Sequence, residues 1–317
     1  MTRYMTVAVI LQVAFLISVS QSAEFTVEKE DGGVAVKRDG KLVTRYHEKS
    51  GAKPILWPLI GPNGNEVTRS YPMMKDGKPD ERKDHVHHRS FWFDHGDVNG
   101  VSFWHEQGGN GEILHRKYVK RAGGRQAVIS TINDWIGPDG KKHCEDLRTL
   151  TFSKHDGQLV IDFDVTVKAS AGKVTFGDTK EGSFGVRVAG TMKVDAEKGG
   201  KIINSEGQED REAWGKPASW VDYHGPVEGN TVGVAILNHP SSFRYPTHWH
   251  VRTYGLFAAN PFGLHDFYGK KADIDGSHTM EPDESFTLRY RVLVHNGDEK
   301  AAKIAEHFEH YAKETPE

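Results

Sequence analysis

From residue 24 onward, short runs of alternating apolar and polar side chains recur along the chain, separated by Gly, Asp and Asn. Segment 159–167 has Leu, Ile, Phe or Val at every second position, with Asp162, Asp164 and Thr166 between them, and segment 286–294 repeats the pattern. A period of two predicts half-buried antiparallel strands with one solvated face. The continuous apolar run 232–237 predicts a strand that is buried on both faces.

Three other stretches depart from this alternation. Segment 54–62 is apolar but contains three prolines, which predicts an edge strand or an ordered loop. Segment 62–84 is polar with Gly and Pro throughout, which predicts a long loop. In segment 298–313 Ala301, Ile304, Ala305, Phe308 and Tyr311 form one stripe and Asp298 is a suitable N-cap, so a helix is expected there.

Many short strands, Gly/Asp turns and one terminal helix predict an all-β fold, a large β-sandwich of two antiparallel sheets with a C-terminal helix. We find no fixed repeat and no linker that would divide the chain, so residues 24–317 are expected to form a single domain.

The first 23 residues have the pattern of a secretory signal peptide. Arg3 is followed by a mainly apolar run from residue 5 to 19 and by the small residues at 20–23, and cleavage after Ser20, Ser22 or Ala23 is compatible with the pattern. A periplasmic or secreted protein with no membrane span after signal removal is expected. Cys144 is the only cysteine, which excludes an internal disulfide framework.

Composition narrows the chemistry. The formal net charge of −3 and the absence of a long Lys/Arg run argue against nucleic-acid binding. The chain has 18 histidines, and histidine is the side chain best suited to metal ligation and proton transfer near neutral pH.

Histidines concentrate in segment 84–100. If residues 84–93 are extended, His85 and His87 share one face of the strand and His88 lies on the other. His248 and His250 form a second His-x-His pair, and two such pairs on neighbouring strands could hold one divalent metal ion of unknown identity. The predicted metal ligands are therefore His85, His87, His248 and His250; alternatively, these are hydrogen-bonded polar residues along a cleft.

Segment 176–185 places two carboxylates and a lysine between glycines. It could present Glu181 as a general acid or base, with Lys180 or Asp178 setting its pKa, or it could be a solvated hairpin tip. His88 and His95 are further candidates for proton transfer, so the predicted catalytic residues are Glu181, His88 and His95.

Aromatic residues and arginines alternate with histidines in segment 238–263. Aromatic faces stack on sugar rings while charged groups bind hydroxyls or a carboxylate, so a carbohydrate is the expected substrate; alternatively, the aromatic side chains are core residues. The predicted substrate-binding residues of all three segments are Arg89, Asp97, Asn99, Asp178, Lys180, Trp249, Arg252 and Asn260.

Several segments together resemble the bacterial PmoA-like family, nominally "methane oxygenase PmoA" and otherwise a domain of unknown function. The resemblance covers nearly the whole chain after the signal. It rests on residues 87–104, 177–187, 204–207 and 249–263, with Ser90 where the family pattern has glycine. It implies a secreted β-sandwich similar in outline to the galactose-mutarotase-like sandwiches. A membrane methane monooxygenase subunit needs several apolar spans of about 20 residues, which this chain lacks, so that activity does not transfer.

These observations favour a secreted or periplasmic carbohydrate-active enzyme of the glycoside hydrolase or lyase type, acting on a small-molecule or oligosaccharide substrate. Two alternatives stay open: a metal-dependent copper or iron oxygenase-like protein, and a non-catalytic glycan-binding protein. The sequence contains no phosphate-binding Gly-x-x-x-x-Gly-Lys-Ser/Thr loop, no Gly-x-Ser-x-Gly elbow and no His-Glu-x-x-His motif.

Overall fold

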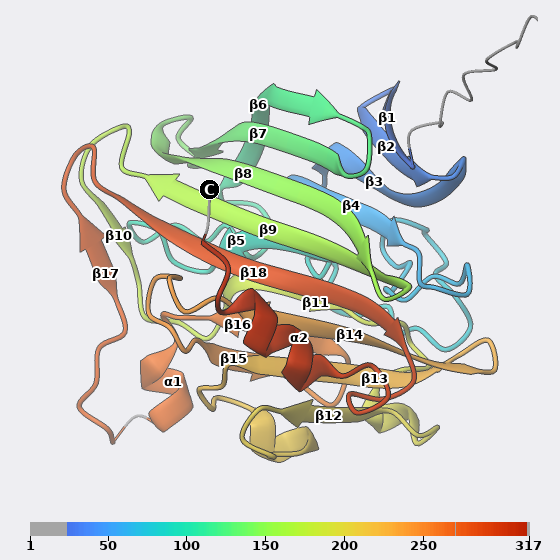
Figure 1. Ribbon diagram of the computed structural model, residues 1–317. Coiled ribbons are helices and arrows are strands. Elements are labelled where there is room, and N and C mark those ends of the chain that lie inside the picture. Colours follow the sequence, from blue (N-terminus) through green and yellow to red (C-terminus); the bar gives the residue numbers. More distant parts are fainter. Residues whose placement is uncertain (1–23, 270, 316–317) are drawn as a thin grey trace, which may run out of the picture.

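Two eight-stranded antiparallel sheets pack face to face in the computed structural model, which describes residues 24–269 and 271–315 (Figure 1). The predicted signal segment lies outside the described residues. The first sheet contains, in spatial order, β1 (Phe25–Glu30), β2 (Gly33–Arg38), β3 (Lys41–Ser50), β4 (Lys53–Leu59), β5 (Phe91–His95), β11 (Gly182–Arg187), β16 (Leu256–Asn260) and β15 (His248–Val251). The predicted all-β sandwich is confirmed.

The second sheet contains, in spatial order, β12 (Lys201–Asn204), β13 (Trp220–Val227), β14 (Asn230–Asn238), β18 (Ser285–Asn296), β9 (Gln158–Lys168), β8 (Lys142–His155), β7 (Ala127–Ile136) and β6 (Glu112–Ala122). A two-stranded ribbon joins β10 (Val174–Phe176) to β17 (His278–Met280), and the short helix α1 (Leu264–Tyr268) follows β16. Two 3-10 turns span Val194–Ala196 and Asp210–Ala213.

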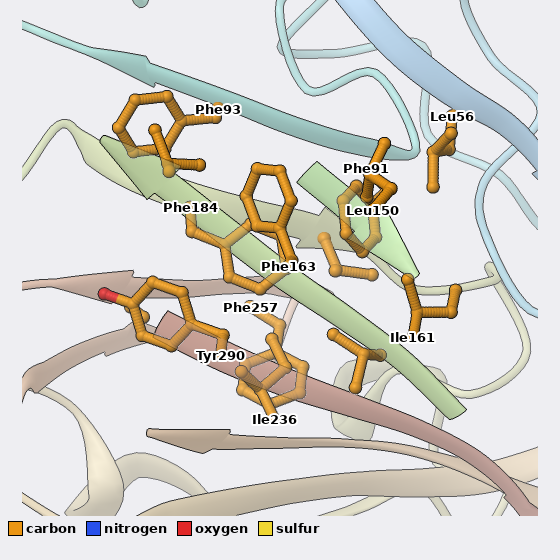
Figure 2. Close-up of a cluster of buried hydrophobic side chains, with 14 of the residues drawn as sticks. Leu56, Phe91, Phe93, Leu150, Ile161, Phe163, Phe184, Ile236, Phe257 and Tyr290 are labelled. Atoms are coloured by element: carbon orange, nitrogen blue, oxygen red, sulfur yellow. The ribbon is translucent and has the colours of Figure 1, made fainter. Parts of the chain in front are cut away.

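The core lies between the sheets, where their inward side chains interdigitate (Figure 2). Phe91 and Phe184 of the first sheet meet at a centroid distance of 4.7 Å, and Phe184 lies 4.9 Å from Phe163 of the second sheet. Phe163 belongs to the predicted alternating segment, and the outward Asp162 on the same strand forms an ion pair with Arg291. A buried phenylalanine side chain contributes about 2 kcal/mol to stability through its removal from water. The alternation of apolar and polar residues therefore determines which side chains form the core.

The C-terminal helix is shorter than predicted. Helix α2 spans Ile304–Tyr311 and packs across the outer face of the second sheet (Figure 1). Lys303 adopts a left-handed conformation with φ 55°, which ends the preceding turn, and the Asp298 side chain accepts a hydrogen bond from the Ala301 N–H in that turn. Of the predicted stripe, Ile304 and Tyr311 are buried and Phe308 is partly buried, whereas Ala301 and Ala305 are exposed.

The prediction for segment 54–62 is wrong, because β4 is an internal strand between β3 and β5. Its register with β3 shifts twice, and neither Pro54 nor Pro58 is a paired position. Irregular pairing of this kind leaves proline without a ladder hydrogen bond to donate. No helix in the described part of the chain has the length and apolar character that a membrane span needs.

Candidate functional site on the outer face of the first sheet

The side of the first sheet that faces away from the core carries polar and aromatic side chains from its central strands. Register defines this face: Trp92 on β5 pairs with Gly185, Arg187 on β11 pairs with Leu256, and His250 on β15 pairs with Ala258. Directly opposed residues point to the same face of a sheet. Three segments far apart in the sequence therefore contribute to one surface.

The histidine stretch forms a loop over this face, which corrects the prediction of an extended strand from residue 84. The strand begins only at Phe91. The buried Arg69 guanidinium donates hydrogen bonds of 2.8–3.1 Å to the backbone carbonyls of Arg82, Asp84, His85 and His88. Because one side chain gathers four carbonyls, the loop turns tightly and does not continue the sheet.

As a result, the imidazoles of the loop stack on one another and do not alternate between faces. His88 lies parallel to Trp92 at 5.4 Å, His85 parallel to His88 at 4.8 Å, and Tyr254 parallel to His85 at 5.5 Å, with interplanar angles of 10–12°. This column of four rings joins β5, the loop and the turn after β15.

His87 meets the column edge-on and extends the imidazole cluster. Its ring lies 4.5 Å from His88 and 4.9 Å from His105. Burial, together with the charge of Lys53 and the neighbouring imidazoles, lowers the pKa of His87 to about 3. His87 is therefore neutral at physiological pH.

Arg187 fixes the tautomer of His88. The guanidinium donates to His88 Nδ1 at 3.0 Å and to Asp84 Oδ1 at 3.3 Å. Since arginine has no acceptor, His88 Nδ1 carries the lone pair and the ring proton is on Nε2. Burial and the Arg187 charge hold the pKa of His88 well below its usual range, and Nε2 is buried without a partner among the described residues.

A network of buried charges supports this column. Lys53 donates to Asp94 at 2.6 Å, and both side chains are fully buried. Asp94 also accepts from the Trp92 indole N–H, and burial raises the pKa of Asp94 to about 6. Arg89, predicted to bind substrate, makes two hydrogen bonds to Glu106 at 2.7 and 2.6 Å. It therefore anchors segment 104–106.

His250 on β15 and the Lys180–Glu181 pair just before β11 form a second group of polar side chains. His250 Nδ1 donates to the Lys180 carbonyl oxygen at 2.7 Å, which leaves the lone pair of neutral His250 on Nε2. Burial lowers the pKa of His250 to about 4, against the opposing effect of the Glu181 charge. Glu181 forms a 2.9 Å ion pair with the Lys180 side chain.

Arg252 connects this group to the aromatic column. Its guanidinium carbon lies 5.4 Å from the centroid of the Tyr254 ring and 5.7 Å from the Trp214 ring. The Tyr254 ring therefore stacks on His85 and lies near two guanidinium groups, those of Arg187 at 4.8 Å and Arg252 at 5.4 Å. We call the set His85, His87, His88, Glu181, Arg187, His250, Arg252 and Tyr254 the candidate site.

The four predicted metal ligands do not come together. His85 and His87 belong to the loop cluster, whereas His250 contacts Trp214 and Phe267, and His248 Nε2 hydrogen-bonds to the Tyr268 hydroxyl. Two groups in the described part of the chain bring three ligand atoms within 4.8 Å of one another, and neither contains a predicted ligand: His155, Asp156 and His307, and Asp222, His224 and Glu299. The positions of the four predicted ligands do not fit one shared metal ion, so the chemistry proposed below involves no metal.

Two predicted site residues lie in the core between the sheets. His95 is fully buried against Phe262 at 4.9 Å and hydrogen-bonds to the Gly177 carbonyl oxygen at 2.8 Å. Trp249 is also fully buried, and its indole N–H donates to Ala218. These placements do not support proton transfer by His95 or sugar stacking by Trp249.

Four other predicted residues hold loops in place. Asp97 accepts from Gly100 N–H, and the Asn99 carboxamide donates to the Lys173 carbonyl just before β10 and accepts from the Thr175 N–H within it. Asp178 accepts from the backbone N–H of residues 265 and 276, and Asn260 donates to the carbonyl of residue 179. Asp178 and Asn260 thus fix the backbone that presents Lys180 and Glu181.

The sequence reasoning assigned no role to Arg187, which belongs to the candidate site, or to Arg69, Lys53 and Asp94, which support it. Arg187 lies in segment 177–187, which carries the family resemblance, so that segment held a signal for it. Lys53 and Asp94 have no local motif, because their partnership depends on the pairing of β4 with β5. One hollow of about 560 Å³ lies elsewhere, between the β2–β3 and β8–β9 turns, and involves none of the candidate site.

A family match covers most of the chain. Residues 33–309 match the family described as "Family of unknown function (DUF6807)". The chain belongs to this family. The match gives no activity, and it does not show the PmoA-like name that the sequence suggested. No curated protein matches the chain.

Several solved structures are distantly similar to this member of the DUF6807 family. The GH36 α-galactosidase AgaB from Geobacillus stearothermophilus has a TM-score of 0.44 at 10% identity, over 88% of this chain and 40% of that one. The galactosidase domain of the α-galactosidase-sucrose kinase AgaSK has 0.34 at 10%, over 66% and 30%. A galactose mutarotase-like protein from Lactobacillus casei has 0.37 at 10%, over 86% and 100%. The chain thus spans less than half of either galactosidase chain, and these likenesses assign it no activity.

Proposed function

We propose that this protein is an exported carbohydrate-active enzyme of the glycoside hydrolase or lyase type, and that it acts at the candidate site. The observation that carries the proposal is the position of Tyr254. It stacks on His85, and the guanidinium carbons of Arg187 and Arg252 lie 4.8 and 5.4 Å from the centroid of its ring, so groups from the histidine loop, β11 and the β15–β16 turn share one surface. A concentration of rings, neutral imidazoles and charges suits a polyhydroxylated ligand.

Glu181 is the carboxylate best placed for proton transfer. Asp84, Asp94 and Glu106 each accept from at least one buried or nearly buried cation, whereas Glu181 pairs with a lysine whose side chain is 38% exposed. Its backbone is fixed, because its carbonyl accepts from Gly96 N–H at 2.6 Å. A held carboxylate whose neighbouring cation is partly exposed can exchange a proton with a substrate.

The two tautomer-locked histidines hold other groups of the site in position. His88 has a proton on Nε2 and His250 has a lone pair on Nε2. Both side chains are almost fully buried, His88 at 1% and His250 at 2% exposure, so neither ring meets a substrate hydroxyl at the surface. We assign them to positioning: His88 accepts from Arg187, and His250 donates to the Lys180 carbonyl beside Glu181.

Glycan turnover tests the proposal. Glu181→Gln keeps the shape of the side chain and removes its titration, so turnover should fall by about 10²–10⁴, the usual contribution of general acid–base catalysis. Purified variants are assayed on a polysaccharide panel for new reducing ends and for unsaturated products. The control is Glu309→Gln, an exposed position on α2, which should leave turnover unchanged.

The outcomes separate the alternatives. Equal turnover by Glu181→Gln and the wild type would remove Glu181 from catalysis. Glycan binding by the wild type without turnover would identify a non-catalytic binding protein. Stoichiometric copper or iron in the purified protein would favour the oxygenase-like alternative, although the separated histidine pairs give it no support. N-terminal sequencing of the exported protein tests removal of segment 1–23.

A further inference from the structure

Arg252 is a cation held in place without an anion. Its guanidinium lies against the Trp214 and Tyr254 rings, and it has no ion pair or side-chain hydrogen bond within residues 24–269 and 271–315. By contrast, Arg69, Arg89 and Arg187 of the same surface each contact a carboxylate. Two aromatic contacts restrict the guanidinium while its N–H edges stay unpaired by protein.

The charge balance around Arg252 points to the same missing partner. Arg69, Arg187, Arg252 and Lys180 supply four positive charges, and the carboxylates that they contact are Asp84 and Glu181. The neighbouring His87, His88 and His250 are neutral, because burial lowers the pKa of each. Asp84 and Glu181 are thus held by other cations, which leaves Arg252 with no carboxylate of its own among the described residues.

We propose that Arg252 binds a carboxylate of the substrate, so that the substrate is an acidic sugar such as a uronate. A planar guanidinium held near two rings and unpaired by protein has N–H groups that match a carboxylate through two parallel hydrogen bonds. The inference rests on the proposed function and specifies the substrate class for the same site.

Binding measurements with small probes test this directly. The full chain is titrated with glucuronate and galacturonate, and separately with glucose and galactose, while the Arg252 Nε–Hε signal is followed by NMR. The uronates should shift this signal and the neutral sugars should not. Arg252→Gln, which lacks the signal, provides its assignment.

Affinity for acidic oligosaccharides provides the second measurement. Arg252→Gln should weaken binding of oligogalacturonides by about tenfold or more, the scale of one lost charge-assisted hydrogen bond. Arg252→Lys should weaken binding less, because it keeps the charge and loses the paired geometry. The control is Arg125→Gln, an exposed arginine in the β6–β7 turn, which should leave affinity unchanged.

Failure of this inference can be distinguished from failure of the proposed function. Equal affinity for oligogalacturonides and for their methyl esters would overturn the carboxylate while leaving a glycan-active enzyme in place. Binding of sulfated but not uronate oligosaccharides would overturn it in the same way. No shift of the Arg252 signal with either uronate, together with no turnover of any glycan, would remove both.

Discussion

At the scale of single residues, the Lys53–Asp94 pair is a fully buried ion pair beneath the candidate site. The two side chains meet at 2.6 Å and neither is exposed; Lys53 also lies 3.8 Å from Glu106, whereas Asp94 has its ion pair with Lys53. Removal of one partner of a buried pair costs about 3–5 kcal/mol, because the remaining charge stays buried and unpaired. Lys53→Met should therefore lower the free energy of unfolding by about that amount, as measured by urea denaturation.

An exposed pair provides the matched control. Lys173 and Glu281 meet at 2.7 Å with side chains about 60% exposed, so Lys173→Met should change the stability by less than about 1 kcal/mol. The double variant Lys53→Met/Asp94→Leu should lose less than the two single variants together, because it leaves no lone buried charge. Additive losses would show that the pair is not coupled.

Residue types predicted only part of the site. Glu181 and Arg252 belong to the candidate site, because charged side chains are rarely fully buried and both of these stay partly exposed. His95 and Trp249 do not, and the reason is the face of the strand: His250 lies outward while the adjacent Trp249 points into the core. Alternation shows that neighbours point apart, but it does not show which one faces the core.

At the scale of elements, β5 and β11 fit together because Gly185 leaves room for Trp92. A Cβ at Gly185 would lie 2.4 Å from the Trp92 ring, which is itself stacked on His88. Gly185→Ala should therefore displace the Trp92 indole and with it the column of four stacked rings. The expected result is a loss of about 1–3 kcal/mol in stability and a reduced affinity for substrate. Thermal denaturation and glycan binding measure the two effects.

Gly108→Ala is the control for this substitution. A Cβ at Gly108 has open space around it, and the residue has no left-handed backbone conformation, so the variant should behave as the wild type. If Gly185→Ala melted at the wild-type temperature, the indole would have to move freely. The close stacking of the column would then be wrong.

Local sequence could not predict the path of two elements. Segment 54–62 looked like an edge because prolines do not donate, yet β4 is internal because its register shifts at those positions. The histidine loop looked like a strand because its curvature is imposed by Arg69, which lies well before it in the sequence. Both depend on contacts that a local pattern does not contain.

At the scale of the whole molecule, sheet order brings the site together. Strand β11 lies between β5 and β16, so segments near residues 90, 185 and 250 become neighbours. Periodicity predicted that two antiparallel sheets form, because it reflects local burial. It did not predict the order of strands in each sheet, because that order follows from how distant segments pack.

The buried histidines make the whole fold sensitive to acid. Burial lowers the pKa of His95 to about 4, and that of His250 also to about 4, from 6.5. The unfolded chain therefore binds more protons than the folded one between these values. The stability that these residues contribute is complete above pH 6.5 and is lost as the pH falls towards 4, by about 3 kcal/mol for each fully buried imidazole.

Asp94 opposes this trend, because its pKa is raised to about 6 and its protonation below that pH favours the folded state. His87 and His248 add to the loss, since burial lowers their pKa values to about 3 and about 4. The histidine effect should dominate, so urea midpoints should fall steadily from pH 7 to pH 4.5. His95→Gln should make this fall shallower, because the difference in bound protons between the unfolded and the folded chain decreases by up to one. A urea midpoint that stayed constant across this range would show that these imidazoles titrate normally and are open to water.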